Sequence, residues 1–177
     1  LVRAGNWRRV LVFVATRNAT ENLARKLSDT GIPAAPFHGE MSQGARTDTL
    51  EAFRAGRTDV LVTTDLAARG IDIAALEVVV NFDLPRAPAD HVHRIGRTGR
   101  AGAAGLAVSF ISAATDAHFR LIESRQHMTV PREQVAGFEP IDIAPPPEAP
   151  GTGGIKGKRP SKKDKLRAAA ARGGNAS

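Results

Sequence analysis

The segment from His91 to Gly102, HVHRIGRTGRAG, places three arginines at three-residue intervals among glycines. Arg94, Arg97 and Arg100 would therefore lie on roughly one face of a helical turn that continues into a tight loop. Guanidinium groups are planar, permanently charged forks that bind phosphate oxygens two at a time, and glycines let the backbone approach a ligand closely. The segment predicts a phosphate-binding site. The alternative is a solvated basic loop whose arginines pair with nearby acids.

Within this segment, HRIGRTGR resembles the last sequence motif of the DEAD-box RNA helicases, in which arginines contact the phosphates of ATP. The resemblance extends upstream in the order and spacing of that family and covers about Val10 to Ser112. It implies the second, C-terminal RecA-like domain of the helicase core. Four segments carry it: VLVFVAT (10–16), HGEMSQGAR (38–46), VLVTTDLAARGIDI (60–73) and VVVNFDLPRAPADHVHRIGRTGRAG (78–102).

The resemblance implies roles for individual residues around ATP. Arg97 and Arg100 would contact the ATP phosphates and neutralise the charge that builds up on the transferring group. Asp72 would accept hydrogen bonds from the ATP ribose, with a helix or turn cap as its alternative role. His93 and Arg94 would support the interface with the partner domain, and a plain structural role is an equal alternative for His93.

A second set of residues matches family positions that hold the sugar-phosphate backbone of RNA: Gly39, Gln43, Arg46, Thr64 and Arg69. Contacts with the sugar-phosphate backbone give little specificity for the RNA sequence. The first turn of a helix beginning at Gln43 would also present free amides to an anion. The alternatives are capping of a helix or strand end for Gln43 and Thr64, and surface ion pairs for the two arginines. Thr16 and Arg17, at the end of the first predicted strand, are further candidates for contacts with the RNA backbone.

Parts of an ATP site are missing from the sequence. It has no GxxxxGK[ST] phosphate loop, no DEAD sequence to hold magnesium and no adenine-reading segment. In the family these parts belong to the first RecA-like domain. The resemblance therefore implies that ATP with Mg²⁺ binds between this chain and an N-terminal RecA-like domain, which supplies the Mg²⁺ ligands. Without that domain we expect no RNA-stimulated ATPase activity.

Aliphatic and β-branched runs alternate with helical patterns along the chain. This alternation predicts an α/β fold in three layers, a parallel sheet with helices on both faces and ligands at the carboxyl ends of the strands. The resemblance implies the same RecA-like architecture, of the P-loop NTPase type. Ser42 should cap the second helix, and Ala117, Leu121 and Ile122 should face inward from the last. Strands are expected at 10–16, 34–38, 59–64, 77–82 and 105–111, with helices at 18–30, 43–55 and 114–127.

The chain has 177 residues, of which 42% are hydrophobic, enough for one domain and a tail. The absence of cysteine excludes disulfides and thiolate metal sites, and the five scattered histidines lack the paired spacing of metal ligands. The longest apolar run, VLVFVA, is far too short to span a membrane. We therefore expect a cytoplasmic monomer without a metal site or a membrane partner. A start at Leu1 rather than methionine favours a fragment or a trimmed polypeptide.

The net charge of +7 resides in the C-terminal end of the chain. Residues 151–177 carry eight Lys and Arg against one acid, Asp164, whereas residues 1–150 carry equal numbers of bases and acids. We predict a helicase C-terminal RecA-like domain at 1–138, a Pro/Gly-rich linker at 139–155 with an edge strand at 139–143, and a basic disordered tail at 156–177. The tail would raise RNA affinity without specificity. The alternative is a solubilising extension.

The function that these features imply is the C-terminal half of an ATP-dependent RNA helicase that unwinds short RNA duplexes. Its partners would be RNA and the N-terminal RecA-like domain. One alternative is a stand-alone RNA-binding or regulatory half-domain without catalysis, although such a module has no use for arginines aimed at a nucleotide. Another is a fragment of a superfamily-two DNA helicase, against which stands the detailed match of HRIGRTGR and ARGID to the DEAD-box form.

Overall fold

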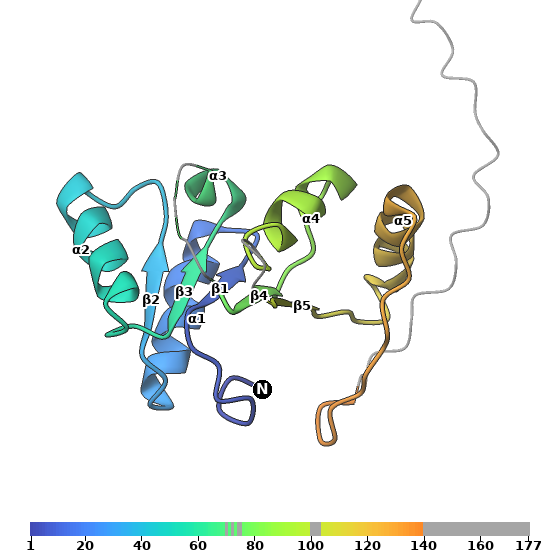
Figure 1. The fold of residues 1–177 in the computed structure, drawn as a ribbon, viewed down its shortest axis with the longest axis horizontal. Coiled ribbons are helices and arrows are strands. Elements are labelled where there is room, and N and C mark those ends of the chain that lie inside the picture. Colours follow the sequence, from blue (N-terminus) through green and yellow to red (C-terminus); the bar gives the residue numbers. More distant parts are fainter. Residues whose placement is uncertain (70, 72, 74–75, 100–103, 140–177) are drawn as a thin grey trace, which may run out of the picture. The chain divides into compact units, whose positions relative to one another are not determined.

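A single sheet of five parallel strands organises the chain (Figure 1). The structure, a computed structural model, describes residues 1–69, 71, 73, 76–99 and 104–139. All of them belong to the unit Leu1–Ala144; a second unit, Pro145–Ser177, lies outside the described residues. The strand order is β2-β3-β1-β4-β5. The strands are β1 (Val10–Phe13), β2 (Ala34–Phe37), β3 (Val60–Thr63), β4 (Val78–Asn81) and β5 (Leu106–Ser109).

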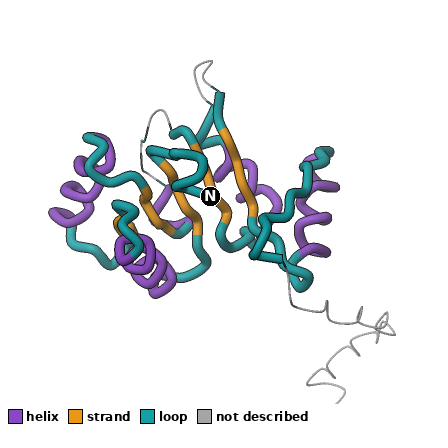
Figure 2. Tube along the Cα trace, turned by 90° about the horizontal axis from the view of Figure 1, so that it is seen from below, coloured by secondary structure: helices purple, strands orange, loops and turns teal. Residues whose placement is uncertain are grey.

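Helices flank the strands, as Figure 2 shows in a second view. The α/β fold with a parallel sheet and flanking helices is thus confirmed, and each strand and helix predicted between residues 10 and 127 has a counterpart. Among the described residues no helix is long and apolar enough to cross a membrane. The helices are α1 (Arg17–Asp29), α2 (Gln43–Arg54), α3 (Asp65–Ala68), α4 (Pro88–Ile95) and α5 (Asp116–Gln126).

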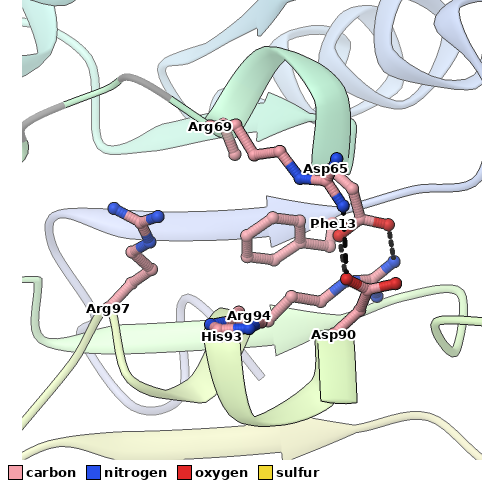
Figure 3. Close-up of a pocket in the computed structure, with 8 residues that line it drawn as sticks. Phe13, Asp65, Arg69, Asp90, His93, Arg94 and Arg97 are labelled. Atoms are coloured by element: carbon pink, nitrogen blue, oxygen red, sulfur yellow. Dashed lines mark hydrogen bonds and ion pairs between the residues drawn. The ribbon is translucent and has the colours of Figure 1, made fainter. Parts of the chain in front are cut away.

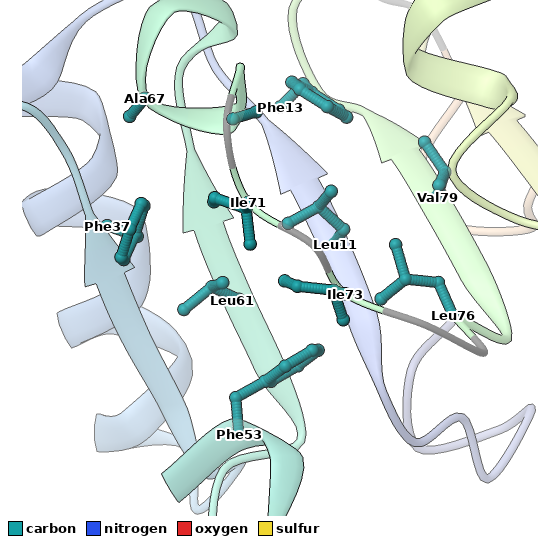
Figure 4. Packing of buried hydrophobic residues seen from close by; sticks show 11 residues of the cluster. Leu11, Phe13, Phe37, Phe53, Leu61, Ala67, Ile71, Ile73, Leu76 and Val79 are labelled. Atoms are coloured by element: carbon teal, nitrogen blue, oxygen red, sulfur yellow. The ribbon is translucent and has the colours of Figure 1, made fainter. Parts of the chain in front are cut away.

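The hydrophobic core lies on both faces of the sheet, because successive side chains of a strand point to opposite sides. On one face Leu11 and Leu61 lie in a cluster with Phe53 of α2 (Figure 4). On the other face Val12 lies in a cluster with Ala24 of α1. Every residue of β1, β3 and β4 is buried, as expected for strands covered on both faces. This core fixes the strand ends from which the site is built.

The shortest helix, α3, is not predicted by the sequence pattern. It has four residues, too few to display a helical period. Thr64, at the end of β3, begins it by accepting a hydrogen bond from the Ala67 amide at 3.5 Å. The helix places Asp65 beside α4, and this position matters for the site.

The inward face of α5 differs from the prediction. Phe119 and Ile122 are buried, whereas Leu121 is 47% exposed and Ala117 is exposed. Leu121 lies one residue from Ile122, about a quarter turn around the helix, and falls outside the face on which Phe119 and Ile122 pack. The predicted edge strand at 139–143 lies outside the described residues except for Glu139, which is in no strand.

Candidate functional site

Three helices begin at one edge of the sheet, where the adjacent strands β2, β3 and β1 end. Each begins with a hydroxyl side chain that accepts a hydrogen bond from a backbone amide three residues later, at 3.2 to 3.5 Å. These N-cap residues are Thr16 for α1, Ser42 for α2 and Thr64 for α3. The cap at Ser42 is therefore confirmed, and the Thr64 hydroxyl is engaged in capping, the alternative role considered for it.

Arg94 is the best-anchored side chain of this region. It is 3% exposed, and its Nε and Nη2 donate to the two carboxylate oxygens of Asp65 at 2.7 and 2.8 Å. Nη1 donates to Asn81 Oδ1 at 3.0 Å and to the Asp83 carbonyl at 2.7 Å, and the guanidinium lies 4.8 Å from the Phe13 ring centre. A buried charge needs such pairing. Arg94 thus joins α4 to α3 and β4, and its direct contacts lie inside this domain.

Arg97 lies beyond the end of α4 and lines a small hollow together with Arg94 (Figure 3). Its backbone amide donates to the Arg94 carbonyl at 3.1 Å. Its side chain makes one long hydrogen bond, from Nη1 to the Ile71 carbonyl at 3.4 Å. No carboxylate pairs with Arg97 among the residues that the structure describes. The remaining lining residues are Phe13, Asp65, Ala68, Arg69, Asp90 and His93.

The structure places Arg69 in this hollow, away from the other predicted RNA contacts on the loop after β2. Its Nη2 lies 3.4 Å from Asp90 Oδ1, and 68% of its side chain is exposed. The ion-pair alternative is therefore realised for Arg69 in the free domain. His93 also lines the hollow and is exposed, and its side chain makes no hydrogen bond or ion pair among the described residues.

Three other predicted RNA contacts are brought together in the loop after β2 and the first turns of α2. Gly39 and Gln43 are exposed, and a Cβ added at Gly39 would meet nothing within 4 Å. The Arg46 guanidinium lies 4.7 Å from the Phe37 ring centre and is half-exposed. Thr64 follows β3, the strand next to β2. This surface is open to a ligand.

Two side-chain contacts attach the same loop to α1. The Arg17 guanidinium pairs with Glu40, and His38 Nε2 lies 3.1 Å from Glu21 Oε1. His38 is 7% exposed. Arg17, a further candidate for contact with the RNA backbone, is therefore partly neutralised by Glu40 in the free domain.

Several residues that build the site carry no signal in the sequence. Asp65, Asn81, Asp83 and Asp90 act through partners distant in the chain, and single acids or amides at strand ends are common. Asp83, which follows β4, illustrates this: its Oδ2 accepts a hydrogen bond from the amide of Ala15, 68 residues earlier, at 2.7 Å. No cluster of acids and histidines suited to a metal ion occurs within the described ranges.

Two of the predicted ATP contacts, Asp72 and Arg100, lie outside the described residues. Their roles therefore remain predictions. The described part of the site consists of Arg97 in the hollow, the anchored Arg94 and the open loop at Gly39 and Gln43.

Residues 1–102 match the family described as the helicase conserved C-terminal domain. Among curated proteins, the chain is 45% identical over 129 residues to the ATP-dependent rRNA helicase RRP3 of Phaeosphaeria nodorum. It is 42% identical over 129 residues to the ATP-dependent RNA helicase DeaD of Escherichia coli K12. Both alignments cover 73% of this chain but only 24% and 20% of the relatives. The chain thus spans a quarter or less of these relatives' length.

Solved structures with a similar fold also come from DEAD-box proteins. The chain is 36% identical, with a TM-score of 0.76, to a structure of the E. coli DEAD-box protein SrmB bound to regulator of ribonuclease activity A, covering 81% of this chain and 85% of that one. It is 37% identical to the C-terminal domain of the DEAD-box protein Dbp5, with a TM-score of 0.63, covering 68% and 71%. A structure of S. cerevisiae Dbp5 bound to RNA and ADP BeF3 matches with 38% identity and a TM-score of 0.61, covering 66% and 32%.

The family match spans more than half of the chain, and its fold matches solved domains of DEAD-box proteins over most of their length. The five-stranded parallel sheet is accordingly the RecA-like sheet of that family. The chain belongs to the helicase conserved C-terminal domain family and is a C-terminal helicase domain of the DEAD-box type.

Proposed function

We propose that this chain is the C-terminal half of an ATP-dependent RNA helicase that separates short RNA duplexes. Within it, Arg97 and Arg100 would act on the phosphates of ATP. The observation that carries the proposal is the state of Arg97, a cation that lines a hollow without a carboxylate partner among the described residues. Its neighbours Arg94 and Arg69 are both paired with acids.

The relatives support the ATP part of this proposal, since RRP3 and DeaD are named ATP-dependent helicases and a Dbp5 structure holds RNA and ADP BeF3. ATP with Mg²⁺ would bind between this domain and an N-terminal RecA-like domain, on which the Mg²⁺ ligands are expected. Arg97 and Arg100 would neutralise charge on the transferring phosphoryl group, and Asp72 would contact the ribose. Arg94 holds α4 in place, so the loop that carries Arg97 starts from a fixed helix end.

The RNA part of the proposal assigns the sugar-phosphate backbone to the loop at Gly39, Gln43 and Arg46. Open space at Gly39, the exposed amide of Gln43 and the start of α2 suit a ligand that approaches the backbone closely. Thr64, which lies beside this loop, would also contact the RNA backbone. Arg69 would have to exchange Asp90 for a phosphate.

The first test is a fusion of this chain behind the N-terminal RecA-like lobe of E. coli DeaD, with RNA-stimulated ATP hydrolysis as the measurement. Arg97→Ala should lower kcat roughly a thousandfold, as for arginine fingers in other phosphoryl-transfer enzymes. Arg25→Ala, on the exposed surface of α1, is the matched control and should leave kcat unchanged. Equal turnover with and without Arg97→Ala would refute the proposal.

A second measurement separates the remaining alternatives. Competition between RNA and DNA oligomers of one sequence, with the fusion and an ATP analogue, should favour RNA. Preference for DNA would support the superfamily-two DNA helicase. A chain that binds RNA equally well with and without the lobe and the nucleotide would support the stand-alone binding module.

A further inference from the structure

A continuous line of hydrogen bonds connects Arg94 to α5 through the domain interior. Each bond joins two different elements, so none belongs to the regular bonding of a helix or the sheet. We call these groups the hydrogen-bond relay. In order, they are Arg94, Asn81, Ser109, His91, Gln126 and the carbonyl of Pro88.

The half of the relay next to Arg94 has defined donors. Asn81 is fully buried, and its Oδ1 accepts a hydrogen bond from Arg94 Nη1 at 3.0 Å. The amide nitrogen of Asn81 then donates to Ser109 Oγ at 3.0 Å. Because this bond occupies the oxygen of Ser109 as an acceptor, its hydroxyl hydrogen is available for the next group in the relay.

The half next to α5 fixes the tautomer of His91. Gln126 Nε2 donates to the Pro88 carbonyl at 2.6 Å, so its Oε1 accepts from His91 Nδ1 at 3.1 Å. In a neutral imidazole the other nitrogen, Nε2, then has no hydrogen. It accepts from Ser109 Oγ at 3.5 Å. All five bonds therefore donate in one direction, away from the Arg94 cation.

His91 lies in surroundings that favour the neutral ring. It is 3% exposed, and its ring packs edge-on against Phe119 with 5.7 Å between ring centres. Burial lowers the pKa of His91, and the nearby Arg94 charge lowers it further, although the hydrogen bond that His91 donates to Gln126 works in the opposite direction. Gln126 and Phe119 of α5 and Ser109 of β5 face the ring and carry no charge. A protonated ring would add a second cation beside Arg94 and reverse the hydrogen bond to Ser109.

We propose that neutral His91 is a positioning residue for Arg94 and, through Arg94, for the helix end that presents Arg97. His91 acts through Ser109, which binds the amide nitrogen of Asn81 and so orients Asn81 Oδ1 toward the Arg94 guanidinium. The backbone bond from Arg97 to the Arg94 carbonyl, at 3.1 Å, is the link to the loop. The last step rests on the proposed function of Arg97, whereas the positioning of Arg94 does not.

The direct test needs no nucleotide. Exchange of the Arg94 Nε hydrogen with water is measured by ¹⁵N NMR on this chain, relative to an unstructured arginine at the same pH. Arg94 Nε donates this hydrogen to Asp65 Oδ1, with 2.7 Å between the two atoms, so the hydrogen should be protected from exchange at pH 7.5. His91→Phe, which keeps a ring against Phe119, should lower the protection at least tenfold. Ser109→Ala should do the same from the β5 side.

Two features of this experiment separate positioning from general loosening. Protection of the backbone amides of β1 and β3 should stay unchanged in both variants, and the double variant should lose no more protection than the stronger single variant. In the unsubstituted chain, the protection at Arg94 should also fall under acidic conditions, at a pH below the ordinary histidine pKa of about 6.5, because burial lowers the pKa of His91. His91→Phe should abolish that pH dependence. Full protection in His91→Phe and Ser109→Ala, or a parallel loss at β1 and β3, would overturn the inference.

His118→Phe is the matched control. His118 Nε2 lies 2.7 Å from the Pro85 carbonyl, so this change also removes one histidine hydrogen bond from α5, but outside the relay. Protection of the Arg94 Nε hydrogen should be unaffected. A loss equal to that in His91→Phe would overturn the inference, because any histidine bond at α5 would then have the same effect.

The fusion with the DeaD lobe tests the step from Arg94 to Arg97. His91→Phe should lower kcat for ATP hydrolysis at least fivefold, with KM for ATP changed less than twofold. If Arg97→Ala lowers kcat and His91→Phe does not, this last step is overturned. If Arg97→Ala has no effect while the NMR result holds, the proposed function fails and the positioning of Arg94 stands.

Discussion

Arg69 and Asp90 form an exposed ion pair beside the hollow that Arg97 lines, with 3.4 Å between Nη2 and Oδ1 (Figure 3). Arg69 is one of the residues proposed to hold an RNA phosphate. A phosphate and the Asp90 carboxylate would therefore compete for one guanidinium. In the free domain the pair partly neutralises the charge of Arg69.

Asp90→Asn should accordingly raise RNA affinity about twofold to fivefold, the range that corresponds to an exposed pair worth up to about 1 kcal/mol. Anisotropy of a labelled single-stranded RNA measures the change. Asp116→Asn is the matched control, because it opens the exposed Asp116–Arg120 pair and alters net charge equally. If both variants bind RNA alike, Arg69 is not the group that Asp90 restrains.

Removal of the Asp65 carboxylate should destabilise the domain strongly. Asp65→Ala leaves the Arg94 charge, 3% exposed, without its acid, and breaking a buried pair in this way costs about 3 to 5 kcal/mol. Because 35% of the Asp65 side chain is exposed, we expect the lower end of that range. Urea unfolding gives the free energy. A loss no larger than that of Asp116→Ala would show that water compensates Arg94.

The strands were the most predictable part of the fold, for a physical reason. β1, β3 and β4 are buried on both faces, so their sequences are uninterrupted apolar runs that no surface helix would show. The cap at Ser42 was predictable because capping depends on neighbours in sequence. The face of α5 was not: its pattern is blurred by the exposed Leu121 beside the buried Ile122.

The site was only half predictable. The regular spacing of Arg94 and Arg97 indicates neighbouring positions on a turn. It does not indicate which of the two side chains is buried. That is decided by acids distant in sequence, since Asp65 lies 29 residues before Arg94. The same holds for Arg69 and Asp90, 21 residues apart. Only the folded sheet brings the end of β3 next to α4.

Glu123 should contribute stability that acid removes. Arg132 holds the pKa of this carboxyl down, as does the hydrogen bond from the Val130 amide, to about 2 from an ordinary 4.5. Because the folded pKa is the lower one, the stabilisation is complete above about pH 4.5 and is lost as the pH falls toward 2. Thermal unfolding between these pH values should thus show a smaller decline in Glu123→Gln. An identical decline in both proteins would contradict this assignment.

Gly39→Ala should separate RNA binding from stability. A Cβ at this position meets nothing within 4 Å, so the free energy of unfolding should stay the same or rise slightly. If the RNA backbone passes close to Gly39, the methyl group should weaken RNA binding severalfold. Gly56→Ala is the contrasting variant: its φ of +71° should make it lose stability, with RNA affinity retained. Unchanged RNA affinity in Gly39→Ala would remove this loop from the proposed RNA surface.

The basic C-terminal segment should set much of the salt dependence of RNA binding. Residues 151–177 carry eight Lys and Arg and one acid, and each phosphate contact on single-stranded RNA contributes about 0.7 to the slope of log affinity against log salt. A chain that ends at Pro150 should therefore bind RNA more weakly and with a slope lower by several units. The measurement is an anisotropy titration at several salt concentrations.

A segment of equal length with its eight basic residues replaced by glutamine is the control for this prediction, because it keeps the chain length and removes the charge. If charge is responsible, this protein should behave like the one that ends at Pro150, since counterion release depends on the cations alone. If it binds RNA like the unchanged chain, length and not charge would be the cause. Loss of solubility with no change in slope would instead favour a solubilising extension.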